Sequence, residues 1–338
     1  MSRRTRILMA ALALFVFLCA VMSGYLNSDT GSKQKYKISV IVYGNNRDRW
    51  AFLREGLNQG AAELPVELSF SAMAQEADPQ EQIRVVNQEI RNGADGILLA
   101  AGDSTVLNQT VAEAAGQLPV LMLETDVEDN AKTLGCLAAD DYEMGKALGN
   151  FVKETYPGKT ISLIDEFTER ASVKRRQEGF IEAVGGEEKI RRWKRGEGDY
   201  GLALYIAKMY RQEGRGTVVA ALDDIALEAV LDAFEQLEEE GGTGTAGYES
   251  LGDRQPLYGI GATSKIVYYL DQGWINGIVF PNEFRIGYAG LNRMVDTLER
   301  QPEAGTDADP AMTTEFYRAD RKTMYEPDLQ RLLFPIVQ

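Results

Sequence analysis

The sequence has no histidine among its 338 residues and only two cysteines, Cys19 and Cys136. Without histidine, Ser-His and Cys-His catalysis, histidine-bound zinc and the usual proton shuttle at neutral pH are all excluded. Cys19 lies in an apolar stretch near the start, so the remainder has one cysteine and forms no disulfide within the chain. We expect no metal site and no cofactor, and a fold that depends on buried apolar surface.

Basic residues are scarce relative to acidic ones. Removing three arginines near the N-terminus from the 36 basic residues leaves 33 against 51 acidic residues, a net charge of −18. Such a surface repels phosphate backbones and anionic lipid headgroups. Nucleic acid is therefore excluded as an expected partner.

The N-terminus combines basic residues with a long uncharged stretch. Three arginines in the first six residues precede sixteen apolar residues, Ile7–Met22, and no charge follows until Asp29. With the next four residues the uncharged segment reaches twenty, about the length of a membrane-spanning helix and longer than a usual export signal. We expect residues 1–26 to be a membrane anchor, with a cleaved signal peptide as the alternative. The arginines stay in the cytoplasm, so the rest works outside it, cell-membrane associated or secreted.

After a polar tether at residues 27–35, the chain alternates between two patterns. Apolar β-rich runs are expected strands: 38–43, 66–70, 96–100, 119–123, 133–137, 160–164, 190–193, 217–222, 257–260 and 277–280. Amphipathic segments between them are expected helices: 49–63, 79–92, 104–115, 142–155, 171–184, 200–212, 225–239 and 283–300. Continuous apolar strands separated by helices predict parallel sheets covered on both faces. Ten strands favour two doubly wound, Rossmann-like α/β lobes, and residues 238–248 are interpreted as a surface loop.

Polar residues follow many of the expected strands. Examples are Asn45 to Trp50, Glu124 to Asp126, Asp223-Asp224 and Asn282 to Phe284. In doubly wound sheets ligands bind beyond the carboxyl ends of the strands, so two facing lobes would gather these residues at one cleft. Aromatic rings beside carboxylates and amides suit a polyhydroxylated ligand.

Several local strings carry a family resemblance: Val40-Ile41-Val42-Tyr43 leading to Asn45, Gly93 to Leu99, Leu118 to Leu121, Ala139-Asp140-Asp141 with Met144-Gly145, Arg176 to Phe180, Asp223 to Ala226, and Leu332 to Pro335. With the order of elements, they resemble the type I periplasmic sugar-binding proteins (ribose- and galactose-binding types), which share the lac-repressor-core fold. The C-terminal string resembles membrane-associated Gram-positive members. The resemblance implies two lobes joined by a hinge of three crossings, near Ala139, Pro281 and residues 312–315. It assigns residues 36–139 plus 282–312 to an N-terminal lobe and 140–281 plus 313–338 to a C-terminal lobe.

The expected ligand-binding residues are Asn45, Asn46, Trp50, Asp103, Glu124, Thr125, Asp140, Phe167, Lys174, Tyr200, Asp223 and Asn282. Four positions depart from the pattern that the resemblance implies. Glu124-Thr125 replaces an Asp-Arg pair, Lys174 an arginine, Asp223 an asparagine, and Ala262 an aspartate. These changes predict a more acidic pocket than in sugar-binding relatives, suited to an amine-bearing or otherwise unusual polyol.

Other interpretations of these motifs remain open. The acidic residues also suit helix N-termini, where carboxylates cap and complement the dipole, and Trp50 suits core packing as well as ligand stacking. Paired carboxylates would also serve an exported glycoside hydrolase, which needs no histidine. Gly259-Ile260-Gly261 lacks the third glycine of a dinucleotide loop.

The sequence therefore predicts a non-enzymatic, extracytoplasmic solute-binding protein. It would capture a small sugar-like ligand by hinge closure and present it to an ABC permease or to a sensor histidine kinase. A permanent anchor favours the sensor.

Overall fold

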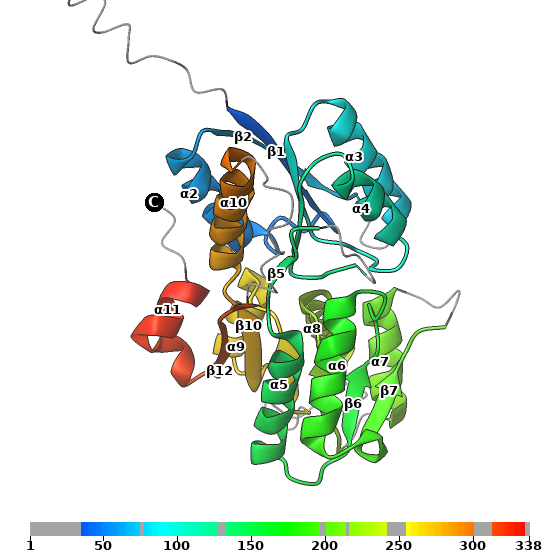
Figure 1. The fold of residues 1–338 in the computed structure, drawn as a ribbon. Helices are drawn as coiled ribbons and strands as arrows, with labels where there is room; N and C mark the ends of the chain where they lie inside the picture. Colours follow the sequence, from blue (N-terminus) through cyan, green and yellow to red (C-terminus); the bar gives the residue numbers. More distant parts are fainter. Residues whose placement is uncertain are drawn as a thin grey trace, which may run out of the picture.

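The computed structural model describes residues 35–74, 78–127, 133–196, 201–213, 216–241, 255–300 and 313–334. Within these residues the chain forms two six-stranded sheets, one in each lobe, covered by helices (Figure 1). Each lobe is therefore doubly wound, as the continuous apolar strands predicted.

The N-terminal lobe has the strand order β11-β5-β4-β3-β1-β2, and in the described residues each pair of neighbouring strands is parallel. Its strands are β1 (Tyr36–Val42), β2 (Val66–Ala72), β3 (Gly96–Leu99), β4 (Val120–Leu123), β5 (Cys136–Ala139) and β11 (Thr313–Thr314). Its helices are α2 (Ala51–Glu63), α3 (Pro79–Arg91), α4 (Asn108–Ala115) and α10 (Glu283–Glu299).

The C-terminal lobe has the order β12-β10-β9-β8-β6-β7; of its neighbouring strands in the described residues, β10 and β12 are antiparallel and the others are parallel. Its strands are β6 (Ile161–Ile164), β7 (Ile190–Trp193), β8 (Val218–Ala221), β9 (Leu257–Ile260), β10 (Gly277–Pro281) and β12 (Phe316–Ala319). Its helices are α5 (Asp141–Thr155), α6 (Ala171–Val184), α7 (Leu202–Glu213), α8 (Asp224–Gly241), α9 (Ser264–Asp271) and α11 (Pro327–Leu333), with short 3-10 turns at Glu187–Lys189 and Thr323–Tyr325.

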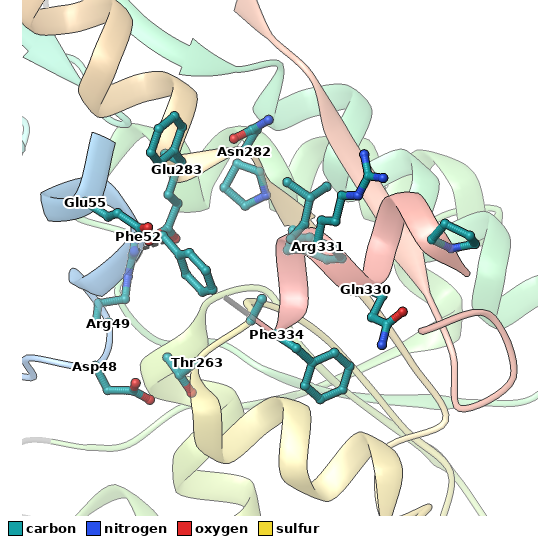
Figure 2. Close-up of a pocket in the computed structure, with 16 residues that line it drawn as sticks. Asp48, Arg49, Phe52, Glu55, Thr263, Asn282, Glu283, Gln330, Arg331 and Phe334 are labelled. Atoms are coloured by element: carbon teal, nitrogen blue, oxygen red, sulfur yellow. Dashed lines mark hydrogen bonds and ion pairs between the residues drawn. The ribbon is translucent and has the colours of Figure 1, made fainter. Parts of the chain in front are cut away.

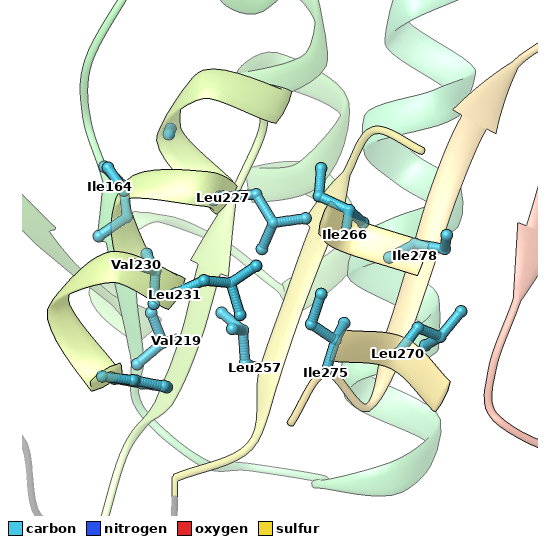
Figure 3. Close-up of a cluster of buried hydrophobic side chains, with 14 of the residues drawn as sticks. Ile164, Val219, Leu227, Val230, Leu231, Leu257, Ile266, Leu270, Ile275 and Ile278 are labelled. Carbon is cyan, nitrogen blue, oxygen red and sulfur yellow. The ribbon is translucent and has the colours of Figure 1, made fainter. Parts of the chain in front are cut away.

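Both faces of each sheet are apolar because neighbouring strand residues point to opposite sides. In the N-terminal lobe, Leu98 and Leu121 join the cluster under α2 and α10, whereas Ile97 and Val120 join the one under α3 and α4. The C-terminal lobe has the same arrangement. Figure 3 shows Leu227 of α8 near Ile266 of α9, in the cluster that covers one face of this sheet.

The hinge contains two strands that the sequence did not predict. β11 pairs with β5 in the N-terminal lobe, and β12 pairs with β10 in the C-terminal lobe. The third crossing therefore falls at Glu315, and Thr313–Thr314 belongs to the N-terminal sheet instead of the C-terminal lobe. A two-residue strand carries no periodicity, so its lobe was not readable from the sequence.

Most predicted elements are present, with shifts at their ends. The strand expected at 133–137 lies at Cys136–Ala139, and α4 begins at Asn108 because the preceding residues form a turn capped by Asp103. The sequence missed α9 as a full helix and α11. The expected loop at 238–248 starts later, since α8 continues to Gly241; the remainder lies outside the described residues.

Candidate functional site

The carboxyl ends of the two sheets face each other, and hydrogen bonds join the lobes directly. Asp48 of the N-terminal lobe accepts from the backbone N–H and the hydroxyl of Ser264, both at 2.7 Å. The backbone N–H of Ala171 donates to the Ser104 hydroxyl oxygen at 2.9 Å. The structure is thus a closed form, with the strand exits gathered between the lobes.

Two of the predicted site residues take part in this closure. The Asn46 side-chain amide donates to Glu228 of α8 at 3.3 Å, and the backbone N–H of Ser172 donates to the Thr125 hydroxyl oxygen at 3.3 Å. Both hydrogen bonds join one lobe to the other, so both require the lobes to be close together.

Arg49 lies at the centre of the closed cleft. Its guanidinium contacts Glu124 at 2.5 Å, Glu283 at 2.6 Å, and Asp224 of the opposite lobe. It also lies over the Trp50 ring, 4.3 Å from the ring centroid. One buried cation thus serves three carboxylates, two from its own lobe and one from the other.

Two of the carboxyl groups around Arg49, those of Glu283 and Asp224, have raised pKa values. Burial, opposed by Arg49 and reinforced by the neighbouring carboxylates, raises the pKa of Glu283 to about 8 and that of Asp224 to about 7. A single guanidinium does not offset three desolvated negative charges, so near neutral pH Glu283 is mostly protonated and Asp224 about half protonated.

A second buried arginine reaches across the cleft from the C-terminal lobe. Arg170 lies between the rings of Tyr43 and Phe167, 4.5 and 4.9 Å from their centroids, and pairs with Asp223 at 2.9 Å. Burial raises the pKa of Tyr43, whereas the pKa of Asp223 is lowered because Arg170 and other arginines outweigh its burial. A third arginine, Arg176, pairs with Asp141 at 2.7 Å.

Two site residues have a left-handed backbone that side chains rarely adopt. Glu124 has φ 60° and Phe167 has φ 61°. Such conformations cost on the order of 1–3 kcal/mol and occur most often where a side chain must be aimed at a functional site. Each residue directs its side chain to one of the two buried arginines.

Several buried polar atoms of the cleft lack a hydrogen-bond partner within the described residues. They include Oε1 of Glu124, Oδ1 of Asp224 and Nη2 of Arg170, from side chains that are 4, 4 and 2% exposed. Unsatisfied buried polar atoms are costly, and those of the cleft include both acceptors and a donor. A polar ligand with hydroxyl or amine groups would satisfy both kinds.

A cavity of about 680 Å³ borders the Arg49 cluster on the side of α11. Figure 2 shows Arg49 and Phe52 approaching from the start of α2, Asn282 and Glu283 from the β10–α10 junction, and Arg331 from α11. The cavity contacts both lobes and the hinge.

Two smaller cavities lie near the other strand exits. One, of about 260 Å³, is lined by Glu124. Glu124 pairs with Arg49, which lines the larger cavity. The other, about 430 Å³, contains Lys174 and Thr105 and lies along the edge of the cleft between β6 and α6.

The remaining predicted residues have diverse positions. Asn45 is exposed and donates to the carbonyl of Ala74, and Asp103 accepts from two backbone N–H groups in a turn, which is a capping role. Trp50 is buried in the N-terminal core, where its indole N–H donates to the Tyr43 carbonyl at 3.0 Å. These contacts agree with the alternative interpretation that Trp50 packs in the core.

Asp140 and Asn282 both cap helices and line cavities. Asp140 accepts from the Glu143 N–H at the start of α5, and Asn282 accepts from the Arg285 N–H at the start of α10. Lys174 is exposed on α6. Tyr200 lies outside the described residues. As ligand contacts, all twelve residues stay predictions.

Charged groups dominate the cleft. Arg49, Asp224 and Glu283 lie in the polar stretches that follow predicted strands, but they were not among the expected ligand-binding residues, because a strand exit does not reveal which of its side chains turns inward. Arg170 was not singled out in the sequence. Arg170 precedes α6, and only the fold places it against Tyr43. In the described part of the chain no three side chains are placed to hold a metal ion.

Nothing among the described helices is both long enough and apolar enough to cross a membrane. The expected anchor, residues 1–26, lies outside those residues, as does the tether up to residue 34.

Two closed lobes, a hinge of three chain crossings and a polar cleft define the class of periplasmic binding proteins. Residues 38–302 match the family described as "Periplasmic binding protein domain", and the chain belongs to that family. The family consists of type I solute-binding proteins and not enzymes, so the hydrolase alternative is set aside. A search of the curated proteins finds no match.

Solved structures share the fold at low sequence identity. A carbohydrate transporter solute binding protein from Agrobacterium radiobacter, in complex with D-arabinose, is 18% identical with a TM-score of 0.76, covering 89% of this chain and 99% of that one. An ABC transporter solute binding protein from Agrobacterium vitis, with bound D-fucose, is 16% identical with a TM-score of 0.74. The match covers 88% of this chain and 100% of that one. A glucose-galactose binding protein from Geobacillus stearothermophilus is 19% identical with a TM-score of 0.71. The match covers 87% of this chain and 100% of that one.

Proposed function

We propose that this protein captures a small sugar or sugar derivative between its lobes outside the cytoplasm and presents the closed form to a membrane partner. The partner is an ABC permease or the extracytoplasmic domain of a sensor histidine kinase. Ligand binding shifts an open ensemble towards the closed form because the ligand contacts both lobes at once.

The observation that carries this proposal is the set of buried, unpartnered polar atoms in the cleft. Glu124 belongs to the N-terminal lobe, whereas Asp224 and Arg170 belong to the C-terminal lobe, and each has an atom without a hydrogen-bond partner in the described residues. A ligand that bonds to all three would lower the free energy of the closed form specifically. The sugars in similar structures support the ligand class.

The choice of partner rests on the N-terminus. Twenty uncharged residues suffice to cross the apolar layer of a bilayer. A permanently anchored receptor suits a signalling partner beside it, whereas a released one suits carriage of ligand to a permease. We therefore favour the sensor kinase.

A thermal-shift screen of neutral sugars, polyols and amino sugars tests the proposal. We expect at least one compound to raise the unfolding temperature in a concentration-dependent manner, because ligand binding to the folded state stabilises it by mass action. Turnover of a glycoside, or no stabilisation by any member of the three classes, would contradict the proposal.

A further inference from the structure

The cavity of about 260 Å³ beside the Arg49 cluster is strongly acidic. Its charged side chains are four carboxylates and one guanidinium, Glu124, Asp126, Asp140, Asp141 and Arg175. Arg175 is exposed and pairs with Glu178 at 3.5 Å, so its charge is directed to another group. The cavity therefore holds more negative charge than its own cation offsets.

Two of these carboxylates lack a cation that would neutralise them fully. Glu124 gives one oxygen to Arg49, but its Oε1 has no hydrogen-bond partner in the described residues although the side chain is 4% exposed. The Asp126 carboxylate accepts a hydrogen bond of 2.8 Å from the backbone N–H of Val127. Among the residues that the structure describes, Asp126 forms no ion pair. Burial raises the pKa of Asp126.

The imbalance extends through the buried centre of the cleft. The guanidiniums there are Arg49, Arg170 and Arg176, and their carboxylate partners are Glu124, Glu283, Asp224, Asp223 and Asp141. The pairs leave two more carboxylates than guanidiniums. Glu283 and Asp224 relieve this shortage of positive charge by holding protons, as their raised pKa values show, whereas ligand hydroxyl groups donate hydrogen bonds without supplying positive charge.

We propose that the ligand carries a protonated amine, which binds in this cavity between Glu124 Oε1 and the carboxylate of Asp126. This inference rests on the proposed function and names its substrate class: an amino sugar or another polyol with a cationic nitrogen. The ammonium donates to Glu124 Oε1 and to the Asp126 carboxylate. A neutral sugar of the same shape would leave Glu124 Oε1 and the Asp126 carboxylate without a cationic partner from the ligand.

Matched sugars test this directly. The full chain, purified in detergent, is titrated by calorimetry at pH 6.5 with D-glucosamine, D-galactosamine and 1-deoxynojirimycin, and in parallel with D-glucose, D-galactose and N-acetyl-D-glucosamine. We expect at least one cationic compound to bind about tenfold more tightly than its neutral counterpart, as hydrogen bonds between charged groups are stronger than neutral ones. In the unaltered protein that preference should vanish at a pH where the amine is neutral.

Variants assign the preference to the cavity. Glu124→Gln and Asp126→Asn should each reduce the preference for the cationic compound several-fold while leaving affinity for the neutral sugar less affected. Glu113→Gln, the same change on the exposed face of α4, should leave the preference unaltered. If the cavity variants fail to fold, the pH dependence in the unaltered protein still decides the question.

The outcomes separate this inference from the proposed function. Neutral sugars that bind as tightly as their amines, or binding of Ca²⁺ alone at this cavity, would overturn the inference and leave sugar capture intact. A preference that survives in both cavity variants would overturn the assigned position. If none of the six compounds binds, the inference is overturned, and the thermal-shift screen of the three wider classes decides whether sugar capture fails as well.

Discussion

At the scale of single residues, Arg49 holds the closed cleft together. It is 7% exposed and contacts carboxylates from both lobes, so it lowers the free energy of the closed arrangement that a ligand would also favour. Removing one partner from a buried ion-pair cluster leaves uncompensated charge, which is more costly than the cluster is favourable.

Replacing Arg49 with methionine should therefore destabilise the protein strongly. We expect a loss of about 3 kcal/mol in the free energy of unfolding, because Glu124, Asp224 and Glu283 would lose their shared cation. Urea denaturation followed by tryptophan fluorescence measures it. Arg47→Met, two residues away on an exposed side chain, is the control and should change stability by less than about 0.5 kcal/mol. Equal effects of the two substitutions would show that the cluster contributes nothing.

The stability of the closed form should depend on pH through Glu283. Its pKa rises from the ordinary 4.5 to about 8, so the folded state binds more protons than the unfolded state between these values. The contribution of Glu283 is therefore full below the unfolded pKa and is lost as pH rises through the folded one. Glu283→Gln removes this loss, so its unfolding temperature should exceed that of the unaltered protein by a margin that grows from pH 5 to pH 8.5.

Thermal unfolding at several pH values measures that margin. Glu299→Gln, at the exposed far end of the same helix, serves as the control and should follow the unaltered protein at every pH. A margin that is constant or that shrinks as pH rises would contradict the raised pKa of Glu283.

The sequence predicted the location of the site better than its contents. Strand exits such as Asn46, Thr125 and Asp223 lie at the cleft because the carboxyl ends of parallel strands share an edge. The inward turn of Arg49 depends on Glu124 and Asp224, which are distant in the chain, and no local pattern encodes it. The excess of carboxylates was readable from the departures at Glu124 and Asp223.

At the scale of elements, glycines allow helices to approach closely. Figure 1 shows α5 and α6 side by side, and a Cβ on Gly145 would overlap the carbonyl oxygen of Arg176, whereas one on Gly179 would overlap that of Tyr142. The same pattern joins α2 and α10, where a Cβ on Gly56 would overlap the Phe284 carbonyl oxygen. These contacts hold Arg176 and Glu283 in place, so helix packing positions the cleft.

Gly179→Ala should force α5 and α6 apart. Overpacking of this kind costs about 1–3 kcal/mol, and the neighbouring atoms are backbone atoms that have little freedom to move. Chemical denaturation measures the change. Gly201→Ala, at a position where an added Cβ meets nothing within 4 Å, should change stability little. Similar results for both variants would contradict the close packing.

Long helices and strands were predicted from the sequence more accurately than short ones. Long amphipathic helices such as α6 and apolar strands such as β9 were placed accurately because their periodicity extends over several residues. The two-residue β11 and the seven-residue α11 were missed because their positions are set by pairing and packing with distant segments.

At the scale of the whole molecule, we expect the N-terminal segment to keep the two lobes at the outer face of the membrane. If residues 1–26 are retained as an anchor, membrane fractions should contain the full-length chain, and deletion of these residues should release a ligand-competent protein. Fractionation followed by mass spectrometry of the N-terminus measures this. Secretion of a form that begins near residue 24 would contradict the anchor and the preference for a sensor partner.

Closure of the two lobes on a ligand is measured by small-angle X-ray scattering. The protein is measured alone and with a saturating concentration of a compound that the thermal-shift screen identifies. We expect a smaller radius of gyration with the compound and a scattering curve that matches the closed structure. An unchanged curve at saturation, with binding verified by calorimetry in the same buffer, would contradict capture by hinge closure.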